Sequence, residues 1–88
     1  METITLDHPI TVSGVEMKSL QLRRPKVRDR LIVDKLAVSD AEKEVLLIAN
    51  LAEIPREAVE DLDLADYLKV QRQLTDFFGS EAARTSGK

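Results

Sequence analysis

The sequence contains one histidine, His8, which directly follows Asp7. An imidazole beside a carboxylate can act as a general base, but only when a nucleophile or a second base lies within hydrogen-bond reach. No pattern in the sequence supplies that second group. Asp-His-Pro at residues 7–9 is instead typical of a turn, because Asp bonds to nearby backbone and Pro cannot donate to a strand ladder. We therefore interpret His8 as a structural residue at an irregular point of a strand.

Acidic residues are concentrated between Glu53 and Asp66, where six carboxylates and Arg56 alone give a net charge of −5. A site for a hard cation needs oxygens that converge on one point, as in calcium loops of the D-x-D-x-D-G type. Asp61 and Asp63 have neither the glycine nor the distal glutamate of such a loop. Most of these acids fall in first turns of expected helices, where the helix dipole favours them. The stretch therefore predicts no metal site.

Basic residues are concentrated between Arg23 and Arg30, where five cations and Asp29 give a net charge of +4. They occupy a strand end and a helix start, where the helix dipole disfavours cations. Three interpretations stay open: a solvated face of balanced charge, a surface for an acidic protein partner, and a nucleic-acid footprint. The last makes a small nucleic-acid-binding regulator the alternative function, although no aromatic or glycine residue is interleaved to stack bases. Arg24 and Arg28 are our candidate partner-binding residues here.

No enzyme motif can be identified: the sequence has no phosphate loop, nucleophile elbow, zinc spacing or pair of catalytic carboxylates. It has no cysteine, which excludes a disulfide scaffold and a thiolate metal site and suits a reducing compartment. We therefore expect a protein that is not an enzyme and that uses no cofactor. A net charge of −3 argues against nucleic acid as the default partner.

Eighty-eight residues, of which 43% are apolar and 33% charged, indicate one small globular domain. The N-terminus lacks the basic and apolar regions of a signal peptide. The longest apolar run, at residues 45–49, is far shorter than the roughly 20 residues that span a bilayer. We therefore expect a cytosolic protein without a membrane segment.

The spacing of apolar residues predicts an α+β fold, with an N-terminal β-hairpin packed on a small bundle of three to four α-helices. The hairpin is expected over residues 2–23 and turns at Ser13-Gly14. Helices are expected over residues 26–37, 39–52, 55–62 and 64–78. The second of them is apolar on nearly all sides, which is typical of a central, buried helix.

Local signals set the boundaries of these elements. Ser39 and Glu42 have the spacing of a capping box, and Gly79 is expected to end the last helix. Residues 1–79 should therefore form a single domain. Residues 80–88 are small and polar, so we expect a disordered C-terminal tail.

The register of the hairpin follows from which residues must share its apolar face. Across the turn, Val12 is expected to face Val15. One extra residue around positions 18–19 of the second strand would then let Leu6 face Leu22, because a one-residue bulge restores the alternation of side chains.

The C-terminal helix carries two neighbouring apolar stripes. One consists of Leu64, Tyr67, Leu68, Leu74 and Phe78, and the other of Val70, Leu74 and Phe77. One stripe suffices to dock a helix on a small core, so the second could stay exposed and bind another protein. The alternative is that both stripes form one wide core face. Our candidate partner-binding residues on this helix are Val70, Leu74, Phe77 and Phe78.

The order of these features resembles the phage tail assembly chaperones of the Mu-like prophage type. The matching segments are ITLDHPITVSG near the N-terminus, LQLRRPKVRDRL at Leu20–Leu31, and LLIANLAEIPREAVEDLDLADYLKVQ at Leu46–Gln71. The resemblance covers residues 3–78. Its most specific pieces are L-R-x-P-K-V-R-D and A-N-L-A…I-P…L-D-L-A-D-Y.

This resemblance implies a function in viral morphogenesis. Such proteins act in the host cell cytoplasm, where they bind the tape measure protein and keep it soluble until tail tube subunits polymerise around it. The tape measure protein, and with it the tail tube protein, are therefore the expected partners. The family implies no catalytic residue. Self-association of the chain as a structural piece of the virion is a further hypothesis.

Overall fold

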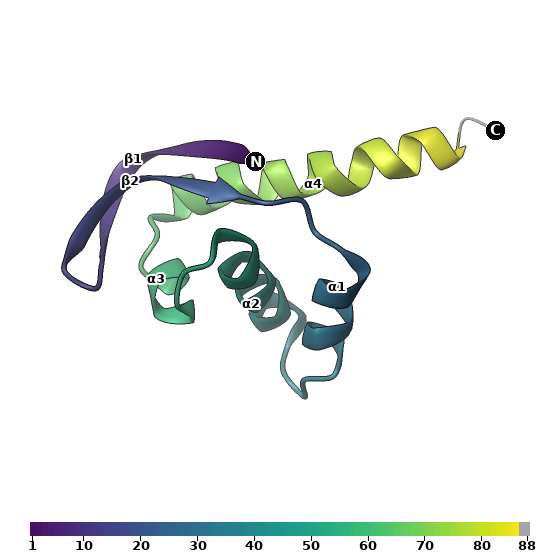
Figure 1. Cartoon of the computed structure of the whole chain (residues 1–88), viewed down its shortest axis with the longest axis horizontal. Coiled ribbons are helices and arrows are strands. Elements are labelled where there is room, and N and C mark those ends of the chain that lie inside the picture. The colour runs from purple at the N-terminus through teal and green to yellow at the C-terminus, as the bar shows by residue number, and fades with distance from the viewer. Residues whose placement is uncertain (87–88) are drawn as a thin grey trace.

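The computed structural model describes residues 1–86, with side chains described as far as Phe78. Two strands precede four helices, which confirms the predicted α+β fold (Figure 1). The strands are β1 (Glu2–Val12) and β2 (Val15–Leu22). The helices are α1 (Val27–Asp34), α2 (Asp40–Ala52), α3 (Arg56–Glu60) and α4 (Leu64–Ser86).

The hairpin turns where the sequence predicts. Ser13 and Gly14 both have positive φ, 52° and 80°, which suits the tight turns that match the twist of paired strands. Val12 faces Val15 across the turn, and the pairing is antiparallel as expected.

The irregular part of the hairpin lies in β1, whereas we predicted it in β2. The register shifts between Thr5 and Ile10, so the additional residues belong to β1 and not to positions 18–19 of β2. Leu22 consequently faces Glu2, and the predicted pairing of Leu22 with Leu6 is wrong. The irregularity falls where Pro9 cannot donate to the ladder.

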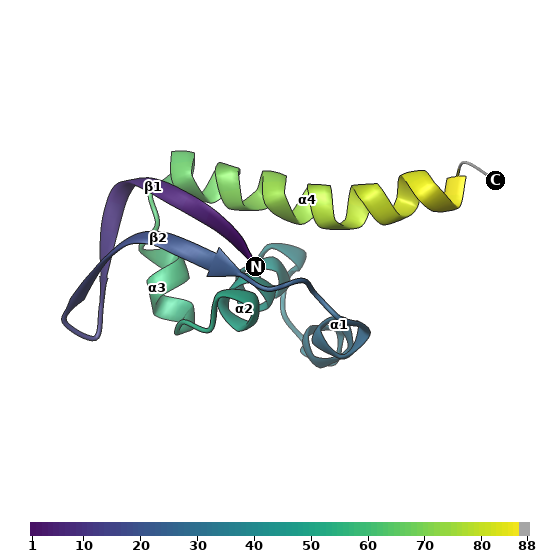
Figure 2. The ribbon, with the colours of Figure 1, turned by 45° about the horizontal axis from the view of Figure 1, so that its top comes forward.

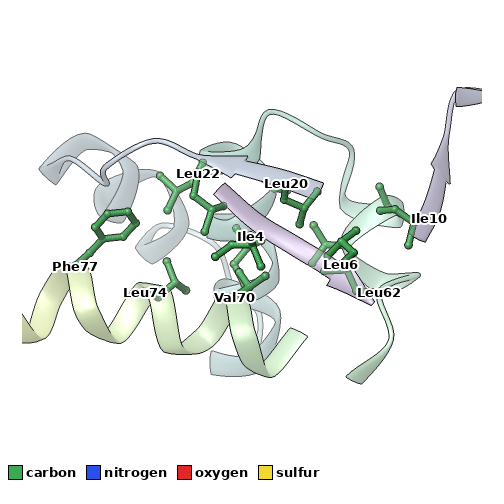
Figure 3. Packing of buried hydrophobic residues seen from close by; sticks show 14 residues of the cluster. Ile4, Leu6, Ile10, Leu20, Leu22, Leu62, Val70, Leu74 and Phe77 are labelled. Carbon is green, nitrogen blue, oxygen red and sulfur yellow. The ribbon is translucent and has the colours of Figure 1, made fainter. Parts of the chain in front are cut away.

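One hydrophobic core joins the inner face of the hairpin to three helices. Figure 3 shows side chains of both strands meeting those of α4. The core contains Ile4, Leu6, Ile10, Leu20, Leu22, Ile48, Ala49, Leu51, Ala58, Val59, Leu62, Val70, Leu74 and Phe77. Since α2 supplies Ile48 and Leu51 with no exposed surface, its predicted central position is confirmed.

Helix α2 begins and ends with recognisable capping. The Ser39 Oγ accepts the backbone N–H of Glu42 at 3.2 Å and its hydroxyl donates to the Glu42 carboxylate at 3.2 Å, so Ser39 is the N-cap, as predicted. The helix ends at Glu53, whose φ of 57° is the left-handed conformation common after helices.

Helix α4 is longer than predicted. Its backbone continues through Gly79 to Ser86, so the prediction that Gly79 ends the helix is wrong. Glycine inside a helix costs only about 1 kcal/mol, and the following Glu81-Ala82-Ala83-Arg84 segment consists of strong helix formers. The predicted disorder of residues 80–88 stays a prediction, and residues 87–88 lie outside the described residues.

Candidate functional site

The apolar stripe of α4 that could have stayed exposed is instead part of the core, as in the alternative in which α4 presents a wide core face. Val70, Leu74 and Phe77 are at most 5% exposed, whereas Phe78 is 50% exposed. The prediction of an exposed strip is therefore wrong for the first three residues. The hairpin is the reason, because its apolar face needs a covering helix and α4 supplies it (Figure 3).

A groove of about 980 Å³ lies between α1, α2 and the second half of the described part of α4. Figure 2 shows α4 passing above α1 in this region. Apolar side chains from all three helices line the groove: Val27 and Val33 from α1, Leu47 from α2, and Leu74 and Phe78 from α4. Because Leu74 also belongs to the core, part of the groove's wall is fixed by the packing of the domain.

Helix α1, which forms one wall, is held by a partly buried ion pair. Asp29 is 2% exposed and accepts two bonds from the Arg23 guanidinium, both of 2.8 Å. It also accepts the backbone N–H of Lys26 at 2.8 Å, which caps the helix. The Arg23 hydrogen bond lowers the pKa of Asp29 to about 2, against the opposing effect of burial.

The packing of α1 is otherwise slight. Its buried residues are Asp29 and Val33 alone, and the helix ends at Asp34, earlier than predicted. Its remaining apolar side chains face solvent, which is unusual in so small a domain. They are Val27 (77% exposed), Leu31 (55%) and Ile32 (52%), followed by Leu36 (41%) just after the helix.

A polar junction connects α4 to α2 beside the groove. The Glu44 carboxylate accepts a short hydrogen bond from the Tyr67 hydroxyl and one of 2.7 Å from the Gln71 amide. Burial, followed by the hydrogen bond to Glu44, raises the pKa of Tyr67 well above its ordinary value. Gln71, which interrupts the apolar stripe in the sequence, thus fixes the position of α4 relative to α2.

A second polar junction connects the start of α4 to β1. Asp66 has no exposed surface, and its carboxylate accepts the backbone N–H groups of Asp7 and His8 at 3.0 and 2.9 Å. These bonds lower its pKa, with a further contribution from Lys69. Lys69 also contacts the Asp7 carboxylate at 2.8 Å. Two backbone N–H groups in the irregular segment of β1 are thus satisfied by a side chain of α4.

An exposed apolar stripe on α4 leads towards the groove. Leu64 (70% exposed), Leu68 (49%) and Phe78 (50%) lie on one face of the helix, in line with Gln71 and Thr75, which line the groove. We call these three residues the α4 stripe. These residues belong to the first of the two predicted stripes, so of the four candidate residues selected on α4 only Phe78 lies on its exposed surface.

Much of the basic stretch has a role within the fold. Besides Arg23, Arg30 pairs with Asp34 at 3.3 Å, and the Arg24 guanidinium lies 5.3 Å from the centre of the Phe77 ring. Arg28 is exposed. These contacts support the interpretation of a face with balanced charge and give no specific support to a nucleic-acid footprint.

The other candidate groups also have local contacts. His8 is exposed and lies 3.9 Å from Asp63, and Arg56 pairs with Glu60 and Glu42 at 2.7 and 3.0 Å. Within residues 1–86, no group of three or more potential ligands could hold a metal ion. None of the described helices combines the length and apolar composition that crossing a membrane requires.

Sequence reasoning missed the residues that build this site. In the sequence, Asp29 and Asp66 look like surface acids. Only the fold shows that both are buried and that their carboxylates accept hydrogen bonds. A signal was present, since both lie in segments that carry the family resemblance, L-R-x-P-K-V-R-D and L-D-L-A-D-Y.

Comparisons with known proteins agree with this resemblance. Residues 3–79 match the family described as phage tail assembly chaperone proteins, E, or 41 or 14. Neither the curated proteins nor the solved structures gave a match. Because the family match spans nearly the whole chain, the protein belongs to the phage tail assembly chaperone family.

Proposed function

We propose that this chaperone binds the tape measure protein in the host cytoplasm and keeps it soluble until tail tube subunits polymerise around it. Membership of the family supports a partner among phage tail proteins. The observation that carries the proposal is the apolar surface formed by the groove, the α4 stripe and the exposed side chains of α1.

The physical argument concerns the cost of exposed apolar surface. A domain of 88 residues gains by burying every available Leu, Ile and Phe, because its core is small. This chain instead leaves Val27, Leu64 and Phe78 at least half exposed. Such a surface can cover an apolar segment of a client and so prevent the aggregation of that segment.

The arrangement also suits release. The groove has polar residues among its apolar ones, including Lys43, Glu44 and Thr75. A binding surface of this mixed kind is typical of transient complexes, whereas permanent interfaces are larger and more apolar. Tail tube subunits could therefore displace the chaperone without unfolding it.

Co-expression with the tape measure protein encoded by the same phage tests the proposal. Val27→Asp and Phe78→Asp place a charge on the surface, at residues 77% and 50% exposed, and should leave the domain folded. Each should reduce co-purification and soluble tape measure protein at least about tenfold, since burying an unpaired carboxylate costs well over 1.4 kcal/mol.

Val15→Asp is the matched control, because Val15 is 64% exposed at the hairpin turn and does not line the groove. It should behave as wild type. A tape measure protein that is equally soluble without the chaperone, or a complex that survives both groove variants, would contradict the proposal.

A further inference from the structure

Among the four helices of the described chain, only α1 contributes no side chain to the hydrophobic core. Its buried residues are Asp29 and Val33, and Val33 lies outside the core cluster. The helix packs chiefly on α2. A segment with so few buried apolar contacts opens at a lower free energy than the core, because little apolar surface meets water when it leaves.

The chain is fixed on both sides of α1. Before the helix, the backbone N–H of Arg23 donates to the carbonyl oxygen of Leu51 at 3.2 Å, which attaches the end of the hairpin to α2. After the helix, Ser39 caps α2. Residues 25–38 therefore form a segment that can move as a unit while its two ends stay attached to the rest of the domain.

One ion pair holds this segment against the fixed chain that precedes it. Asp29 accepts two bonds of 2.8 Å from the Arg23 guanidinium, whose side chain is 30% exposed, so water already reaches one partner of the pair. When the segment moves away, both charges become hydrated, and water replaces the bonds that each of them loses. The pair therefore fixes the position of α1 but separates far more easily than a pair enclosed in the core.

Movement of α1 changes the groove. Val27 and Val33 line the groove from α1, whereas Leu74 lines it from α4 and is fixed by the core. In Figure 2, α1 lies below α4 at the end of the domain away from α3. When α1 moves outward, the groove loses one wall, and the apolar side chains that line it from α2 and α4 become open to a partner.

We propose that residues 25–38 form a lid on the groove, which opens as a unit when the Arg23–Asp29 pair separates and closes when the pair forms again. The exposed apolar surface of α1 fits this role, because Val27 faces the groove and can contact a ligand held there. Opening is a property of the free domain and needs no partner. The use of the lid to admit and retain a client rests on the proposed function.

Native-state hydrogen exchange in low concentrations of urea tests the opening on the unmodified chain. The amides of residues 31–34 bond within α1, and those of residues 48–51 bond within α2. The α1 amides should open at least about tenfold more often than the α2 amides, and their exchange should depend little on urea, because the lid exposes little surface. Equal opening free energies and equal urea dependence in the two groups would overturn the inference.

Distances between spin labels show whether the whole segment moves. The chain has no cysteine, so labels can be attached to a pair of introduced cysteines. Leu31→Cys with Arg72→Cys places labels on the exposed surfaces of α1 and α4, and Asn50→Cys with Arg72→Cys is the control pair between α2 and α4. Both pairs are measured by double electron–electron resonance, with and without Asp29→Asn.

Asp29→Asn weakens the ion pair and should raise the ratio of open to closed lid about tenfold, which is equivalent to about 1.4 kcal/mol. The Leu31 pair should then show a second, longer distance, and the control pair should keep a single one. An unchanged single distance for the Leu31 pair, or equal broadening of the control pair, would overturn the inference. The exchange measurement on the wild type needs no variant and decides the matter if Asp29→Asn does not fold.

The complex with the tape measure protein separates the lid from the proposed function. A client in the groove contacts Val27 and should hold the lid closed, so the α1 amides should exchange at least about tenfold more slowly in the complex. If the complex forms and α1 exchange is unchanged, closure on the client is refuted while the proposed function stands. If α1 opens alone in the free chain but no complex forms, the proposed function fails and the lid stands.

Discussion

The neighbouring residues Phe77 and Phe78 provide the sharpest test of how the domain divides its apolar surface. Phe77 is 5% exposed in the core, and Phe78 is 50% exposed at the groove. Replacing a buried Phe by Ala costs about 3–5 kcal/mol, and the lost contact with Arg24 adds about 0.5–1 kcal/mol. Phe78→Ala removes a half-exposed ring and should cost only about 1 kcal/mol.

These losses are large on the scale of the whole domain. At about 0.05–0.15 kcal/mol per residue, the chain has roughly 4–13 kcal/mol of stability, so Phe77→Ala removes a large fraction of it. Urea unfolding followed by circular dichroism measures both variants. With an m value of about 1–1.5 kcal/mol/M, Phe77→Ala should lower the midpoint by about 2 M or more, and Phe78→Ala by less than about 1 M.

Binding should follow the opposite order. At urea-free conditions where both variants are folded, Phe78→Ala should weaken the complex with the tape measure protein more than Phe77→Ala does. Equal loss of stability in the two variants, or a larger loss of stability in Phe78→Ala, would refute the assignment of Phe77 to the core and Phe78 to the partner surface.

Further predictions concern the polar junctions. Asp29→Asn should lower the free energy of unfolding by about 1–2 kcal/mol at pH 7. This is less than the loss expected for a fully buried ion pair, because Arg23 is 30% exposed and solvent screens its charge. The pKa of Asp29 falls from 3.8 to about 2 on folding, so the ionised carboxylate stabilises the fold above pH 3.8 and this contribution is lost as the pH falls towards 2. Urea titrations at several pH values should show this loss of stability in the wild type and not in Asp29→Asn. Asp66→Asn should lower the urea midpoint more than the exposed-site control Asp63→Asn, because only Asp66 is fully buried; equal midpoints would contradict its role. Tyr67→Phe should cost about 1 kcal/mol in the same assay, and no change would show that its hydrogen bond is unimportant.

The parts of the fold that the sequence predicts are those set by local chemistry. Ser13-Gly14 specifies the turn through its backbone conformation, and Ser39 specifies the start of α2 through its side chain. These signals act within a few residues, so no knowledge of the tertiary structure is needed to interpret them. The apolar character of α2 likewise predicts its central position correctly.

The parts that the sequence does not predict depend on contacts between distant segments. The stripe containing Val70 and Phe77 and the stripe containing Leu68 and Phe78 look equally able to face the core. Only the position of the hairpin decides between them. The groove is a further example, since α1, α2 and α4 each contribute to it and none of them predicts it alone.

The bonds from the backbone of residues 7 and 8 to Asp66 have a consequence for synthesis of the chain. Asp66 is added 59 residues after Asp7, which takes about 3–12 s at about 5–20 residues per second. Until then the hairpin lacks both the carboxylate that completes its irregular strand and the helix that covers its apolar face. We therefore expect the N-terminal segment to have no stable structure during this interval of synthesis, which would make the nascent chain itself prone to aggregation.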